Sequence, residues 1–353
     1  MLRGLFFKRL ETEAFSSVRH LRPVGPGDAG ASVLRVYRQV RRDFGLLVAP
    51  MTLHSPVPDL LAAVWMVCRE TLFCGRLPQA QREAVSAAVS RANRCPFCVE
   101  VHTMSLAALG FERESAALSA GAALPPGEAA DLAHWAAASG RSDCPALLPD
   151  DPGRFAEVAA LAVGFHYINR MVSIFLPESV LPVPARFPRL KALSKRLAVR
   201  MVRPLALRRR REGLGIDLLP PASLPVEFAW AAADERMAQA LGRSAAAFAA
   251  AGEVLPSVAR RRVEDRLAAW EGEDMPLGSA WLEEALGDLH GAERAAARLG
   301  LLAALAAYRV GDAEVAAFRR HWPADEDLLR VCAWGSFAAV RRIGSWLRPP
   351  AGL

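Results

Sequence analysis

The chain has 353 residues, of which 52% are hydrophobic and 23% charged, a balance that excludes an intrinsically disordered protein. Its formal net charge is +7, but 37 acidic residues accompany the 44 basic ones and only residues 186–211 form a basic stretch, so we expect no nucleic-acid partner. No continuous apolar run reaches the ~18 residues that span a membrane, and the apolar start at residues 4–7 is too short for a signal peptide, so we expect a cytoplasmic protein with no membrane partner.

The apolar residues of the first half recur at helical spacing, and no segment shows the period of two that a half-buried strand requires. Glycines and prolines separate the helical segments, as Gly75 and Pro78 do between the second and the third. The third segment has small residues on most sides, which predicts a buried, closely packed helix. We therefore expect an all-α fold, with helices in this half at 33–44, 59–73, 79–92, 95–109, 125–140 and 155–176.

Residues 177–225 have a different character, because prolines punctuate a stretch rich in arginine. We interpret this segment as an inter-domain connection that contains one or two short basic helices. Its simplest role is a solvated surface segment, and the alternative is a surface that meets an acidic partner or a membrane.

The second half echoes the first. Predicted helices at 234–251 and 257–270, joined by a short proline-containing link, follow the pattern of 59–73 and 79–92. A later helix at 326–347 resembles the one at 155–176 in length and position. We therefore predict a tandem duplication with a degenerate second copy, in which residues 275–278, Met-Pro-Leu-Gly, stand where the first copy has Cys-Pro-Phe-Cys.

Six cysteines are present, too few for a disulfide framework in a cytosolic chain of this size. Two of them form a pair, Cys95 and Cys98, separated by Pro96 and Phe97. Proline is favoured at the first position of a helix, which places Cys95 at the N-cap and Cys98 in the first turn. Unpaired N–H groups and the helix dipole favour a thiolate there. The remaining cysteines are expected to be buried and unreactive: Cys68, Cys74, Cys144 and Cys332.

His102 lies four residues after Cys98, on the same helical face, where it is placed to exchange a proton with that sulfur. We therefore expect Cys98 to be the more reactive thiol. Glu83 lies on the preceding helix, and an antiparallel return of the chain brings it near the thiols. The alternative is an exposed carboxylate in the first turn of its helix. Glu100 points elsewhere and is expected to be a surface residue.

Other uses of a CxxC pair fit the sequence less well. A c-type haem site needs histidine directly after the second cysteine, where Val99 stands here. A thioredoxin site needs a preceding strand, and here a helix precedes the pair. A structural zinc site usually has four ligands, and only His102 is nearby. We keep zinc and two unreactive cysteines as alternatives.

The spacing from Glu83 through Cys95 and Cys98 to His102 resembles the signature of the AhpD-like alkyl hydroperoxidases, within the carboxymuconolactone decarboxylase superfamily. The resemblance covers roughly residues 35–180 and includes Phe44-Gly45, His54-Ser55-Pro56, residues 65–78 and residues 165–171. It implies an AhpD-like all-α fold and a cysteine-based peroxidase without a cofactor. By this resemblance Cys98 attacks the peroxide, Cys95 resolves the sulfenic acid, and His102 and Glu83 relay protons.

The sequence departs from the family at Phe97, where the best-studied members have a histidine between the two cysteines. The proton relay therefore has to use His102 and Glu83 alone. His166 and Asn169, three residues apart on one helical face, are placed to line the site or to form a buried structural pair, and we favour the structural role.

The resemblance and the residues together divide the chain into an N-terminal arm (1–40), an AhpD-like catalytic domain (41–180), a basic connection (181–225) and a degenerate second domain (226–353). We expect a thiol-dependent hydroperoxide reductase or disulfide oxidoreductase. Its partners are a hydroperoxide and an external dithiol or low-molecular-weight thiol, and it forms homo-oligomers. The alternative is a non-peroxidase member of the superfamily, either a redox sensor or a biosynthetic protein that uses the same pocket.

Overall fold

The computed structural model describes residues 10–146, 151–181, 183, 186–208 and 210–349. These residues form helices and loops with no β-strand among them, which confirms the predicted all-α class. Residues 1–9, which include the apolar start of the chain and the beginning of the predicted arm, lie outside the described residues. The predicted boundary after residue 40 falls within a helix, α2.

The helices of the first half agree closely with the predicted ranges, and short helices that were not predicted lie between them. They are α2 (Ala31–Phe44), α3 (Ala49–Thr52), α4 (Pro58–Cys68), α5 (Gln79–Ala92), α6 (Pro96–Ala108), α7 (Glu112–Ala120), α8 (Glu128–Ala138) and α9 (Pro152–Phe175). In α5 every residue from Gln81 to Ser90 is buried, as its small side chains predict.

The predicted helix at 59–73 continues beyond α4 as a π-helical turn, Arg69–Phe73. Arg69 and Glu70 in this turn are fully buried. A buried charge must be paired, and Arg69 Nε lies 2.8 Å from a carboxylate oxygen of Asp43 on α2. Glu70 accepts a hydrogen bond from the N–H of Gly213, with a distance of 2.9 Å, so the turn ties the basic connection to the core.

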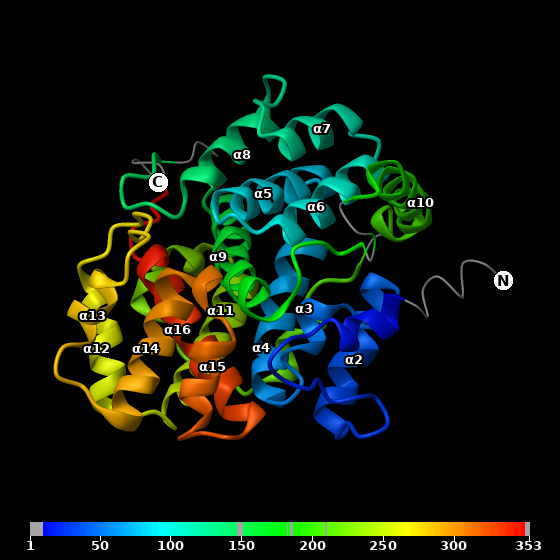
Figure 1. The fold of residues 1–353 in the computed structure, drawn as a ribbon. Helices are drawn as coiled ribbons and strands as arrows, with labels where there is room; N and C mark the ends of the chain where they lie inside the picture. Colours follow the sequence, from blue (N-terminus) through cyan, green and yellow to red (C-terminus); the bar gives the residue numbers. More distant parts are fainter. Residues whose placement is uncertain (1–9, 147–150, 182, 184–185, 209, 350–353) are drawn as a thin grey trace.

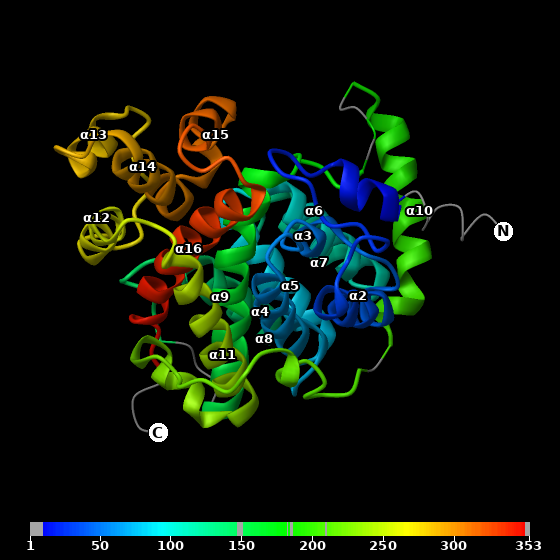
Figure 2. The same cartoon turned by 90° about the horizontal axis from the view of Figure 1, so that it is seen from below.

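Helix α9 runs through the middle of the molecule in both views, with α12 (Ser257–Ala268), α13 (Ala280–Leu286) and α14 (Gly291–Leu305) on one side and α2 and α10 (Pro188–Ala206) on the other (Figures 1 and 2). It packs against α4, α5 and α16 (Asp325–Gly344). Although no continuous apolar run of spanning length was expected, α9 is long and apolar enough to cross a membrane by length and composition. In its most apolar window 83% of the residues are buried inside the protein, as in the core helix of a globular protein.

After α9 the chain forms one long basic helix and then the helices of the second half. They are α10 (Pro188–Ala206), η2 (Ile216–Leu218), η3 (Val226–Ala233), α11 (Glu235–Gly252), α12 (Ser257–Ala268), α13 (Ala280–Leu286), α14 (Gly291–Leu305), η4 (Ala307–Arg309), α15 (Asp312–Arg319) and α16 (Asp325–Gly344). The prediction of short helices in the connection is wrong for α10, which has 19 residues and continues past Pro204. Pro204 lies in the last turn, where its missing N–H costs a single hydrogen bond.

The helices that the predicted duplication pairs with one another lie against each other, α4 against α11 and α9 against α16. The buried apolar residues of both halves form one cluster. No helix begins at Pro276, since α13 starts at Ala280, so the second half lacks a counterpart of the helix start at Pro96. The duplication and the division into domains stay predictions.

Candidate active site at the start of helix α6

The cysteine pair lies where the sequence predicts, at the N-terminus of α6. Cys95 is the N-cap residue, Pro96 occupies the first turn, and Cys98 follows within that turn. The N–H of Cys95 donates to the carbonyl of Ser90 in α5, with a distance of 2.9 Å. The chain reverses between the two helices through Arg94, whose φ of 54° lies in the left-handed region that few non-glycine residues adopt.

Glu83 and His102 meet beside the pair. Nδ1 of His102 lies 2.6 Å from Oε2 of Glu83, and both side chains are buried. The other carboxylate oxygen of Glu83 accepts a hydrogen bond from Gln79, with a distance of 2.8 Å, so the alternative of an exposed first-turn glutamate is wrong. The imidazole packs edge-on against Phe165, with ring centroids 4.7 Å apart. Nε2 has no hydrogen-bond partner among the described residues, which leaves that nitrogen available to a substrate.

Both thiols are free and buried, and their pKa values are shifted in opposite directions. The hydrogen bond that Cys98 donates lowers the pKa of Cys95 below its ordinary value, against the opposing effect of burial, and Ser173 and Asn169 add further hydrogen bonds. Burial raises the pKa of Cys98 well above its usual range, and the neighbouring charge on Cys95 acts in the same direction. In the reduced pair Cys95 is therefore the more acidic of the two thiols. The sequence analysis predicts that Cys98 is the more reactive thiol, because only Cys98 has His102 on its own helical face.

Asn169 connects the thiols to a polar network behind them. It hydrogen-bonds both cysteines, and its amide nitrogen lies 3.0 Å from Oγ of Ser90. Asn93 donates to Oδ1 of Asn169 at 2.9 Å and lies 3.0 Å from Nδ1 of His166. His166 thus belongs to the structural network, as expected, whereas Asn169 reaches the sulfur atoms. Sequence reasoning missed Ser173, although it lies four residues after Asn169 and therefore on the same face of α9.

Each cysteine borders a different space. Cys98 and His102 line a mainly apolar cavity of about 520 Å³, together with Phe97, Cys68 and Phe165. Cys95 instead lines a more open groove of about 470 Å³, whose walls include Arg91, Arg94 and Lys195. The pair therefore connects an apolar cavity on one side with a basic groove on the other.

Glu100, expected to be a plain surface carboxylate, holds one wall of the apolar cavity. Its Oε2 accepts hydrogen bonds from Oγ of Ser179 at 2.6 Å and from the N–H of Val180 at 3.0 Å. Its other oxygen forms an ion pair with Lys191 of α10 at 3.2 Å. Ser179 and Val180 both line the cavity, so Glu100 fixes the segment that closes it.

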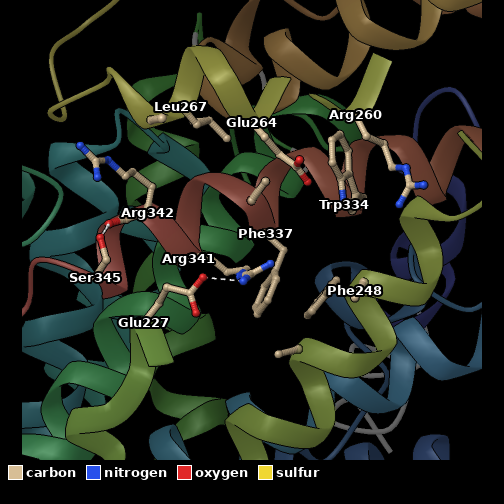
Figure 3. A pocket seen from close by; sticks show the side chains of 14 residues that line it. Glu227, Phe248, Arg260, Glu264, Leu267, Trp334, Phe337, Arg341, Arg342 and Ser345 are labelled. Carbon is tan, nitrogen blue, oxygen red and sulfur yellow. Dashed lines mark hydrogen bonds and ion pairs between the residues drawn. The ribbon is translucent and has the colours of Figure 1, made fainter. Parts of the chain in front are cut away.

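A second cavity, of about 640 Å³, lies in the second half between α11, α12 and α16 (Figure 3). The stacked pair Phe248 and Phe337, with ring centroids 4.2 Å apart, lines it together with Arg341, which is ion-paired with Glu227. None of its lining residues is a cysteine or a histidine. This cavity therefore offers no thiol or imidazole to a bound molecule. Among the described residues no group of three or more His, Cys, Asp or Glu side chains is arranged to hold a metal, so the pair lacks the ligand set of a structural zinc site.

Burial keeps the imidazoles of His54 and His166 neutral, so we expect the protein to lose stability as the pH falls. The pKa values of His54 and His166 are lowered from 6.5 to about 3. Below pH 6.5 the unfolded chain binds protons that the folded protein refuses, so the free energy of unfolding should fall by on the order of 3 kcal/mol per histidine between pH 6.5 and pH 4. Urea denaturation across this range should show a flatter pH slope for His166→Gln than for the wild type. Equal slopes would contradict the assignment of the acid sensitivity to His166.

Comparisons with known proteins identify a family domain that contains the candidate site. The model of the carboxymuconolactone decarboxylase family matches residues 58–139, a range that contains Glu83, Cys95, Cys98 and His102. Over 331 residues the chain is 38% identical to a protein of Mycobacterium tuberculosis that is described as an alkyl hydroperoxide reductase. That alignment covers 94% of this chain and 95% of the relative, so the likeness extends through the second half.

Proposed function

Since the chain belongs to the carboxymuconolactone decarboxylase family, we propose that it is a thiol-dependent hydroperoxide reductase in which Cys98 attacks the peroxide and Cys95 resolves the product. The observation that carries the proposal is the placement of the two thiols. Cys98 opens onto an apolar cavity beside His102, and Cys95, the more acidic thiol, accepts a hydrogen bond from Cys98. An organic hydroperoxide fits the apolar cavity, whose walls offer little to a strongly hydrated molecule.

The first step begins with a proton transfer between the two thiols. The proton of Cys98 passes along the existing hydrogen bond to the thiolate of Cys95. The new Cys98 thiolate attacks the terminal peroxide oxygen, the O–O bond breaks, and Cys98 becomes a sulfenic acid. His102, oriented by Glu83 and carrying a proton on Nε2, protonates the leaving alkoxide to give the alcohol.

The second step closes the pair. The Cys95 sulfur attacks the sulfur of the sulfenic acid, a disulfide forms, and the proton of Cys95 leaves with the hydroxide as water. The hydroperoxide has then gained two electrons and the two thiols have lost them. An external dithiol returns the electrons by thiol–disulfide exchange and restores the protons on Cys98 and His102. Phe97 lines the cavity but has no titratable group, so it takes no part in the relay.

A steady-state assay tests this function. Cumene hydroperoxide should be consumed in the presence of dithiothreitol for many cycles per chain, and faster than hydrogen peroxide, because the cavity is apolar. The alternative function, a redox sensor, predicts consumption of a single equivalent. Consumption that stops after one equivalent in the presence of excess dithiol would contradict the enzyme.

A further inference from the structure

Helix α10 carries an unusual concentration of positive charge. It has no acidic residue among its 19, and its six basic residues are Arg189, Lys191, Lys195, Arg196, Arg200 and Arg203. The four arginines are exposed, and none of them forms an ion pair with another described residue. Lys191 alone is paired, with Glu100. The arginines therefore present an uncompensated cationic surface.

A row of exposed leucines runs beside these arginines. Leu190, Leu193 and Leu197 follow helical spacing, and each residue is more than half exposed, at 51%, 63% and 51%. The opposite face of the helix is occupied, since Ala198 and Val202 line the cavity that contains Cys98. A contiguous row of exposed leucines on a soluble surface is typical of a site where another molecule binds.

This surface adjoins the groove that leads to Cys95. Helix α10 packs along α6, the helix that begins with the cysteine pair, and lies at the edge of the molecule (Figures 1 and 2). Lys195 belongs both to α10 and to the wall of the groove, whose other basic residues are Arg91 and Arg94. Arg94 is ion-paired with Asp274, and Glu100, the acidic residue of the wall, is ion-paired with Lys191. Whatever binds on α10 therefore lies beside the entrance to Cys95.

We propose that the outer face of α10 is the docking surface for an acidic protein that carries the dithiol reducing the Cys95–Cys98 disulfide. This inference rests on the proposed function. One thiolate of the partner attacks the Cys95 sulfur from the groove, a mixed disulfide forms, and Cys98 leaves as a thiolate. The second thiol of the partner then attacks the mixed disulfide and releases Cys95. The partner is oxidised to its own disulfide and the pair regains both electrons.

The positive charge of α10 favours an acidic protein over a second copy of this chain as the binding partner. A symmetric pair of chains joined through α10 would place the same arginines opposite each other, which is repulsive. An acidic protein gains from the same arginines and covers the leucines. Its attraction to the groove also raises the rate of encounter, by about 10-fold to 1,000-fold for strongly complementary surfaces at low salt. An anionic lipid surface is attracted by the same charge but brings no dithiol to Cys95.

The test measures reduction of the preformed disulfide, so that it does not depend on peroxide activity. The protein is oxidised with diamide and reduced by two synthetic peptides that share a Cys-Gly-Pro-Cys core, one flanked by glutamates and one by lysines. The glutamate peptide should be faster, and its advantage should shrink as salt is added. Arg196→Glu combined with Arg200→Glu should slow the glutamate peptide by about tenfold and leave the rate with uncharged dithiothreitol unchanged.

The matched control reverses two exposed arginines of the second half, Arg261→Glu with Arg320→Glu, and should leave both peptide rates unchanged. Equal rates for the two peptides, or equal effects of the two double variants, would overturn the proposal. So would α10 variants that lose binding to vesicles of phosphatidylcholine and phosphatidylglycerol while the peptide rates stay the same. Failure of the proposed function would give a different result. Peroxide would not be turned over with dithiothreitol, although the disulfide formed by diamide would be reduced normally.

Discussion

Replacing Cys98 by serine should abolish hydroperoxide consumption, whereas replacing Cys95 by serine should permit one slow oxidation and then stop. Cys98 is the thiol that borders the apolar cavity, so its loss removes the atom that the peroxide reaches. Without Cys95 no neighbouring thiol forms the disulfide, and the sulfenic acid on Cys98 remains. That oxidation should also be slow, because the more acidic thiol, which accepts the hydrogen bond of Cys98, is gone.

Cys68 provides the control for these variants. It lines the same cavity, but burial raises its pKa to about 12, so it stays protonated and unreactive. Cys68→Ser should therefore keep wild-type turnover. Dimedone labelling followed by peptide mapping locates the sulfenic acid after one peroxide pulse. If label appears on Cys95 in the Cys98→Ser variant while the Cys95→Ser variant stays reduced, the two roles are reversed.

Replacing His102 by alanine should lower kcat by about 10²-fold to 10⁴-fold, the usual contribution of a positioned general acid. The leaving alkoxide then has to take its proton from water. Glu83→Gln should cost less, because glutamine keeps a hydrogen bond to Nδ1 and removes only the negative charge beside the ring. Both rates are read from cumene hydroperoxide consumption at saturating dithiothreitol.

His134→Ala is the matched control for the loss of an imidazole, since His134 is exposed on α8 and lies outside both spaces that border the thiols. It should keep wild-type kcat. Near-UV circular dichroism shows whether each variant keeps its packing, which matters because His102 packs against Phe165. If His102→Ala, still folded, turns over as fast as His134→Ala, the proton relay is not used.

Local patterns predict the start of the site well. Pro96 after Cys95 predicts the helix N-terminus, and the spacing of Cys98 and His102 predicts a shared face, because both features act within one turn of helix. The burial of Glu83 follows from the small residues around it in α5, since helices so closely packed leave little solvent along their faces. The all-α class follows from periodicity along the whole chain.

The acidity of the pair could not be predicted from the same segment. It depends first on the hydrogen bond from Cys98 and on the burial of both thiols, and then on Ser173 and Asn169, which α9 brings to the thiols from more than seventy residues away. The two spaces beside the pair depend on still later parts of the chain, because α10 forms a wall of each. Glu100 looks like a surface residue until the segment around Ser179 folds onto it. These features arise from tertiary packing, which a pattern along the chain does not record.

The most direct test of the central claim is the state of Cys95 and Cys98 in the reduced wild-type protein after one equimolar pulse of cumene hydroperoxide without added dithiol. Samples are quenched with iodoacetamide at successive times and mapped by mass spectrometry. The proposed function predicts a disulfide between Cys95 and Cys98 that forms faster than any other cysteine reacts and disappears when dithiothreitol is added. Recovery of both cysteines as alkylated thiols, oxidised no faster than a free thiol, would contradict it.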